Sequence, residues 1–252
     1  MYTEGGLRQG FVPFLTGTLP FLTGTVVSAL AYRLVFGSRS QVFGSFPFAG
    51  RADRREVALT FDDGPNEPYT SQLLDLLDDR GVPATFFQVG ACVERAPAVT
   101  RRVVESGHVL ANHSFSHSFS RYATAPRQRD EIDRTQALLF DTAGVRPALY
   151  RPPWLCHPPW VLSSIRARRL QVVSGTFAHP LEVFQPPAAL LAAGAARRTR
   201  PGAILILHDG REARGGDRAQ TVRSVGLLVD RLRATGYSFT TVDRLLGVMP
   251  YL

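Results

Sequence analysis

The stretch VALTFDDGP, Val57–Pro65, sets the architecture that the rest of the chain completes. Its first five residues are apolar and β-favouring, which predicts a buried strand, and the final Gly-Pro ends that strand. Two adjacent carboxylates, Asp62 and Asp63, therefore lie at the end of a strand. Close carboxylates push their pKa values apart, so one can bind a cation while the other handles a proton. An ordinary Asp-Gly turn with solvated acids would give the same pattern.

The composition indicates a globular protein with a basic surface. The 252 residues are 44% hydrophobic and 20% charged, enough for one large α/β domain or two smaller ones. The net charge of +8 is carried by arginine, since lysine is absent, and it favours anionic partners. No basic run is interleaved with aromatic residues, which argues against specific nucleic-acid binding. Two cysteines, Cys92 and Cys156, are too few for a disulfide framework, and spacing does not say whether they pair.

The N-terminal segment, residues 1–37, differs from the rest of the chain. Within it, residues 11–37 carry one charge, Arg33, and are long enough to cross a bilayer, which predicts a membrane anchor and an extracytoplasmic domain. Its prolines and Arg33 favour instead a tail packed on the domain or lying at an interface, compatible with a cytoplasmic protein. A cleaved signal would need a stronger basic start. Residues 38–55 are interpreted as a polar connector.

From residue 56 to residue 247 the pattern alternates between strands and helices, with a short tail at 248–252. Strands are predicted at 56–61, 83–89, 108–112, 147–151, 170–177, 202–208 and 237–242. Helices are predicted at 68–80, 97–106, 126–143, 158–169, 186–199 and 219–235. About seven parallel strands, each followed by a helix, favour a closed or nearly closed (β/α) barrel over an open sheet. In such a barrel the chemistry belongs at the C-terminal ends of the strands.

Reactive side chains follow several of these strands. His113 and His117 are four residues apart, a spacing that lets two imidazoles bind one metal ion, and one aspartate completes a set of three ligands. The remaining carboxylate could take a proton from metal-bound water, His208 could protonate the leaving group, and Arg151 could orient the carboxylate. Each residue has an ordinary structural alternative: chance spacing, a core histidine or a surface arginine. The same ligand set also suits ferrous iron, so a non-haem iron oxygenase is a competing interpretation.

Four motifs in this order resemble the polysaccharide deacetylase family, which includes chitin, peptidoglycan and nodulation-factor deacetylases. They are TFDDGP (60–65), HSFSH (113–117), RPPW (151–154) and LHDG (207–210). The resemblance implies a distorted (β/α) barrel and one divalent metal ion, most often zinc, with cobalt, nickel or manganese as alternatives. It implies hydrolysis of an acetyl group, here the N-acetyl amide of an amino sugar in a polysaccharide or a glycosylated small molecule.

The resemblance also implies a role for each matching residue. It makes Asp62 the general base, His208 the general acid and Arg151 the residue that positions the base. It makes Asp63, His113 and His117 the metal ligands. Trp154 would stabilise the oxyanion through its backbone N–H, with Pro152 beside it and Leu205 and Leu207 shaping the acetyl pocket.

Two departures from the family pattern concern the substrate and the rate. Trp154 is followed by Leu155 and Cys156, where the family usually has a glycine. The aspartate that the family places near the fifth strand is missing from residues 172–184, where either His179 or Glu182 substitutes for it or nothing does. A barrel that binds saccharide without turnover is therefore a further alternative.

Overall fold

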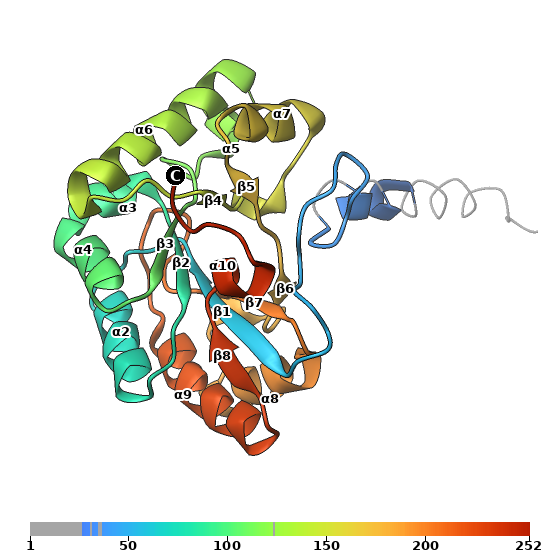
Figure 1. Ribbon diagram of the computed structural model, residues 1–252, viewed down its shortest axis with the longest axis vertical. Coiled ribbons are helices and arrows are strands. Elements are labelled where there is room, and N and C mark those ends of the chain that lie inside the picture. Colours follow the sequence, from blue (N-terminus) through green and yellow to red (C-terminus); the bar gives the residue numbers. More distant parts are fainter. Residues whose placement is uncertain (1–26, 31, 35–36, 123) are drawn as a thin grey trace, which may run out of the picture.

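In the computed structural model, a curved parallel sheet forms the centre of the molecule (Figure 1). The structure describes residues 27–30, 32–34, 37–122 and 124–252. The strands are β1 (Glu56–Asp62), β2 (Thr85–Gln88), β3 (Val109–Asn112), β4 (Leu149–Tyr150), β5 (Gln171–Val172), β6 (Thr176–Phe177), β7 (Ile204–His208) and β8 (Ser238–Thr240). Seven follow the order β5-β4-β3-β2-β1-β7-β6, and β8 pairs with the first part of β1. Every ladder between these strands is parallel, as the alternation of strands and helices predicts.

Helices surround this sheet (Figure 1). They are α2 (Tyr69–Asp79), α3 (Gly90–Arg95), α4 (Pro97–Glu105), α5 (Phe119–Tyr122), α6 (Ala125–Ala143), α7 (Pro159–Ala167), α8 (Ala188–Arg198), α9 (Ala219–Ala234) and α10 (Val242–Leu246), with short 3-10 turns at Pro153–Leu155 and Glu182–Phe184. All six predicted helices are present. The additional ones are four to six residues long, too short for a periodic pattern to reveal.

The predicted strand at 170–177 is in fact two strands, and the break between them shapes the sheet. β5 pairs with β4, whereas β6 pairs with β7 at the opposite end of the strand order. Only residues 173–175 join them, and a Cβ on Gly175 would lie 2.6 Å from the Ile204 carbonyl oxygen. The sheet therefore curls into a distorted half-barrel whose two edges are tied by a three-residue link.

Alternation along β1 explains why its final acid faces the barrel interior. Val57, Leu59 and Phe61 belong to the core cluster shared with α2 and α9, on the outer face of the sheet. Ala58 belongs to an inner cluster with residues from β2, β3, β4 and β7. Successive strand residues point to opposite faces, so Asp62 shares the inner face with Ala58.

The connector at 38–55 packs against the barrel in its second half. Phe46 is buried in a cluster with residues of α7 and β5, and Ala49 forms an antiparallel bridge with Ala203. The candidate membrane segment at 11–37 lies mostly outside the described residues. Among the described residues, no helix has both the length and the apolar character needed to cross a membrane.

Candidate active site

Asp62 is held by a buried arginine at the end of β1. The Arg151 NH1 group donates to Asp62 Oδ1 and to the Thr60 hydroxyl, both at 2.7 Å, and the same guanidinium reaches the carbonyls of Val173 and Ser174 at 3.3 Å. Arg151 is 0% exposed, and this burial lowers its pKa while Asp62 opposes the shift. Arg151 therefore orients the Asp62 carboxylate, which is not part of the cluster formed by Asp63, His113 and His117.

Asp63 turns away from its neighbour toward two histidines. Its backbone lies in the left-handed region, with φ of 73°, and this change of direction separates the two carboxylates. Asp63 Oδ1 lies 3.4 Å from His113 Nε2 and 3.2 Å from His117 Nε2. The three residues are buried, and their ligand atoms all lie within 4.8 Å of one another. This is the three-ligand set that the HxxxH spacing predicts.

Hydrogen bonds leave these three donor atoms available for a cation. His113 Nδ1 lies 2.7 Å from the Arg151 carbonyl, which can only accept, so the proton is on Nδ1 and the Nε2 lone pair faces Asp63. Asp63 Oδ1 is buried and accepts no hydrogen bond, while Oδ2 accepts one from the Glu212 N–H at 2.9 Å. An orphaned carboxylate oxygen beside two imidazole nitrogens fits a bound divalent metal ion.

Charge and burial act on the protonation of these ligands in opposite directions. Burial would raise the pKa of Asp63, but the neighbouring histidines outweigh it, so the pKa lies well below its usual range. Burial lowers the pKa of His117. Both directions favour the metal-binding forms, an ionised carboxylate and a neutral imidazole.

A buried glutamate on α6 holds the loop that carries both histidines. Glu131 Oε2 accepts from the backbone N–H groups of Phe115 and Ser116 at 3.2 and 2.6 Å, and from the hydroxyls of Ser114 and Ser116 at 3.1 and 2.9 Å. In this loop Ser114 and His117 have positive φ. The role of Glu131 could not be predicted from the sequence, because a helical acid 14 residues after His117 carries no motif signal.

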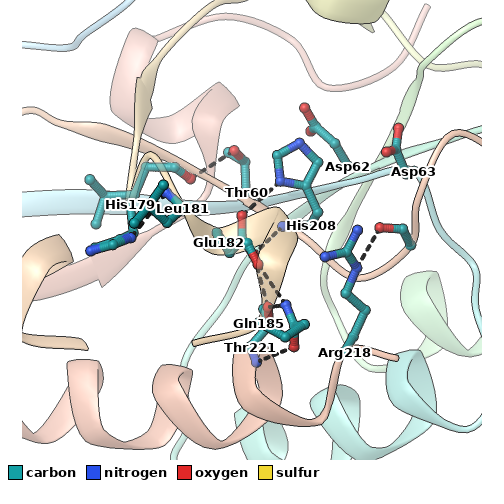
Figure 2. A network of polar contacts seen from close by, with 12 residues as sticks. Thr60, Asp62, Asp63, His179, Leu181, Glu182, Gln185, His208, Arg218 and Thr221 are labelled. Atoms are coloured by element: carbon teal, nitrogen blue, oxygen red, sulfur yellow. Dashed lines mark hydrogen bonds and ion pairs between the residues drawn. The ribbon is translucent and has the colours of Figure 1, made fainter. Parts of the chain in front are cut away.

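Glu182 contacts both the ring and the backbone N–H of His208, which lies at the end of β7. Glu182 Oε2 lies 2.8 Å from His208 Nδ1, and Glu182 Oε1 accepts from the His208 N–H at 2.9 Å (Figure 2). Burial alone would lower the pKa of His208, but the Glu182 carboxylate outweighs it and raises that pKa to about 9. Of the two candidate substitutes for the missing acid, Glu182 contacts His208. The ring of His179 instead accepts from the Leu181 N–H at 3.1 Å.

The next residue, Asp209, is buried behind the acid pair. The Thr70 hydroxyl donates to its Oδ2 at 2.6 Å. Burial raises the pKa of Asp209 to about 7. This carboxyl is directed at the loop after β1 and not at the metal ligands, because a Cβ on Gly64 would lie 2.0 Å from it.

The remaining predicted site residues divide between the cavity and the core. Trp154 and Pro152 line the cavity, and the Trp154 ring packs edge-on against His117 with centroids 4.3 Å apart. Among the described residues, no acceptor is bonded to the Trp154 backbone N–H. Leu205 and Leu207 lie in the outer core cluster, on the face of β7 opposite His208. Neither leucine lines the cavity, so the structure gives no support to an acetyl pocket built from them.

One cavity of about 470 Å³ contains all of the charged groups described above as candidate base, acid and ligands. It is also lined by His179 and by residues that the sequence motifs do not single out: Leu155, Phe177, Pro180, Val183, Arg198, Arg211, Glu212 and Arg218. Most of them come from the loops after β6 and β7, where no spacing pattern identifies them. The two cysteines, both free and buried, do not line it.

The family model and two of the relatives that match this chain describe deacetylases. The family model described as polysaccharide deacetylase matches residues 49–173. A peptidoglycan-N-acetylglucosamine deacetylase of Bacillus cereus is 32% identical over 192 residues, which cover 75% of this chain and 87% of that protein. A chitooligosaccharide deacetylase of a Bradyrhizobium species is 33% identical, covering 76% of this chain and 90% of that protein.

Solved structures agree with these relatives. A peptidoglycan N-acetylglucosamine deacetylase, solved with a hydroxybenzamide-type ligand (4-naphthalen-1-yl-N-oxidanyl-benzamide), superposes with a TM-score of 0.74 at 26% identity, covering 81% of this chain and 94% of that one. A family 4 acetyl xylan esterase of Clostridium thermocellum, in complex with a cobalt ion, gives 0.69 at 33% identity over 78% of this chain and 94% of that one.

Proposed function

The chain belongs to the polysaccharide deacetylase family, and on that basis we propose that it is a metal-dependent hydrolase that removes the N-acetyl group of an amino sugar. The substrate is a polysaccharide or a glycosylated small molecule. One observation carries the proposal. The two adjacent aspartates have separate partners, Arg151 for Asp62 and the two histidines for Asp63.

In this proposal Asp63, His113 and His117 hold one divalent metal ion. Two imidazoles and a carboxylate suit zinc, and cobalt is the ion present in the acetyl xylan esterase. When bound, the ion polarises the amide carbonyl and lowers the pKa of a coordinated water.

The remaining residues act on protons and on charge. Asp62 is the general base, held in place by the buried Arg151. His208 is the general acid for the leaving amine, and Glu182 keeps it protonated and oriented. The free N–H of Trp154 is the proposed donor to the oxyanion of the tetrahedral intermediate. We assign this chemistry to residues 56–247.

The two competing interpretations have less support. An oxygenase would give the Asp62–Arg151 and His208–Glu182 pairs no catalytic role. Hydrolysis uses the first pair as the general base and the second as the general acid. The non-catalytic barrel rested on the missing acid near the fifth strand, and Glu182 supplies a carboxylate to His208.

The test is acetate release from a panel of acetylated substrates: chitooligosaccharides, peptidoglycan fragments, small N-acetyl glycosides and acetylated xylan. Metal content is measured on the same protein. We expect release from N-acetyl substrates, reduced about 10²- to 10⁴-fold in Asp62→Asn. Equal release by the variant and the wild type, or no release from any member of the panel, would refute the proposal.

A further inference from the structure

Three arginines line the active-site cavity without a carboxylate partner: Arg198, Arg211 and Arg218. Among the described residues, none of them lies within ion-pair distance of an acidic group. Arg198 and Arg211 are exposed, so water solvates their charge. Arg218 is different, because it is only 1% exposed.

Arg218 is buried with most of its hydrogen-bonding capacity unused. It immediately precedes α9, and its Nε donates to the Gly210 carbonyl at 2.7 Å. The two terminal NH₂ groups of the guanidinium donate to no group in the described part of the protein. Figure 2 shows this guanidinium extending from the start of α9 toward the side of the site where His208 and Asp63 lie. Arg218 lines the cavity and is held through its Nε, so an anion that enters the cavity would meet a preorganised, positively charged donor.

The carboxylates of the cavity do not supply that partner. Asp62 is paired with Arg151, Asp63 with the two histidines, and Glu182 with His208. The fourth, Glu212, forms no ion pair with Arg218 among the described residues. Asp217, adjacent to Arg218 in sequence, is exposed and accepts from the Ala219 N–H at 2.8 Å.

The backbone N–H groups at the start of α9 are not free to bind an anion. The N–H groups of Gln220 and Thr221 donate to Gln185 Oε1 at 3.1 and 3.2 Å, and that of Ala219 is taken by Asp217. The free donors at this wall of the cavity therefore belong to the Arg218 side chain.

We propose that Arg218, assisted by Arg211, forms an anion-binding subsite, and that the substrate carries a carboxylate or phosphate group close to its acetamido group. The proposal rests on the deacetylase function and specifies its substrate class as an anionic amino sugar. A guanidinium presents parallel N–H groups that match both anions. Arg211 lies on the loop after β7 and also lines the cavity, where its exposed side chain can contact the same anion.

The experiment measures binding separately from turnover, in full-length Asp62→Asn protein loaded with zinc. Three ligands are titrated calorimetrically: N-acetylmuramic acid, N-acetylglucosamine 1-phosphate and the neutral methyl glycoside of N-acetylglucosamine. We expect at least one anionic sugar to bind about tenfold or more tightly than the neutral one. Arg218→Gln should lower the affinity for that anion about 10- to 100-fold and change the neutral glycoside little. The preferred anion identifies the substituent as carboxylate or phosphate.

Matched variants separate this role from a structural one. Arg223→Gln removes the same charge from an exposed position of α9 and should leave the anion preference intact. Arg211→Gln changes an exposed position and should not affect folding. It should lower the affinity for the anionic sugar by a smaller factor than Arg218→Gln does. Thermal unfolding of each variant shows whether the loop that Arg218 holds has stayed folded.

Each other outcome overturns the subsite. An equal loss of affinity for neutral and anionic sugars in Arg218→Gln would mean that Arg218 binds hydroxyl groups. Displacement of the anionic sugar by acetate alone would mean that Arg218 binds the acetate product. An absent anion preference refutes the subsite even where acetate release proceeds. Acetate release that fails on every substrate refutes the deacetylase function, while the binding ratios still decide the subsite.

Discussion

Glu182 and His208 form an ion pair in the lining of the active-site cavity, with Oε2 and Nδ1 2.8 Å apart. Glu182 is 3% exposed and also accepts from the Thr221 hydroxyl at 3.0 Å, so its position is fixed from two elements. A carboxylate from the loop before α8 thus controls the protonation of a histidine at the end of β7.

Glu182→Gln should shift the upper limb of the pH–rate profile to lower pH. The carboxylate raises the pKa of His208 to about 9, and its removal lets burial lower that pKa, by about one unit or more. A cation on Asp63 also lowers the pKa of His208, so the wild-type limb should lie at or below about pH 9. The profile of kcat from pH 5 to 10 measures this. Glu212→Gln removes a carboxylate from the same cavity without touching His208, and an equal shift there would contradict the assignment.

The same pair makes stability depend on pH. Because the folded-state pKa of His208 lies above the ordinary value of 6.5, its contribution is fully present below about pH 6.5 and is lost as the pH rises to about 9. The difference in unfolding free energy between wild type and His208→Gln should therefore decrease across this window. Urea denaturation at pH 6, 7.5 and 9 provides the comparison. A difference that is constant with pH would count against a charged His208.

Metal removal should lower the melting temperature of a protein that retains Asp63, whether or not Asp62 is present. A metal ion that binds only the folded protein stabilises it by about 2.7 kcal/mol at a concentration 100 times its Kd. Calorimetry with and without a chelator should show this stabilisation in wild type and in Asp62→Asn. Asp63→Asn should show little or none. If the metal stabilises the two variants equally, the assignment of Asp63 as metal ligand and Asp62 as general base is wrong.

Arg151→Met should destabilise the protein by about 3–5 kcal/mol, because it leaves the Asp62 carboxylate buried without its partner. Arg168→Met is the matched control. It breaks an ion pair with Asp133, whose side chain is 57% exposed, and should cost less than about 1 kcal/mol. Chemical denaturation measures both. Similar losses in the two variants would show that Asp62 does not depend on Arg151 for its charge.

Glu131→Gln should weaken metal binding about 10- to 100-fold, although Glu131 does not contact the metal ligands' donor atoms. The amide would place its NH₂ group against a cluster of N–H and hydroxyl donors, and the histidine loop would lose its anchor. Competition with a metal-binding dye measures the affinity. Glu94→Gln, at an exposed ion pair with Arg134, should leave it unchanged.

Much of this site could be predicted because parallel strands bring their C-terminal ends to one edge. Residues after β1, β3 and β7 meet there whatever the helices between them do, so Asp63, His113 and His208 could be grouped from sequence. The orientation of Leu205 and Leu207 was also readable, since they are one and three residues before His208 and therefore point to the other face.

Other features depend on contacts that leave no local pattern. Periodicity describes which faces of a strand are buried but not which strand it pairs with, so the exchange of partners at 173–175 was hidden within one apolar run. Glu131 lies on α6 and Arg218 immediately precedes α9, and only the fold reveals that one holds a ligand loop and the other lines the cavity.

The half-barrel also has a consequence for self-association. A sheet that does not close by hydrogen bonds keeps edge groups that could pair with another copy of the chain. Residues 47–50 lie across that opening: the Ser174 N–H donates to the Pro47 carbonyl at 3.0 Å, and the Gly50 N–H donates to the Gly202 carbonyl at 2.8 Å. The segment before the first strand thus occupies edge positions that would otherwise be templates for aggregation, and protects the barrel as a cover strand would.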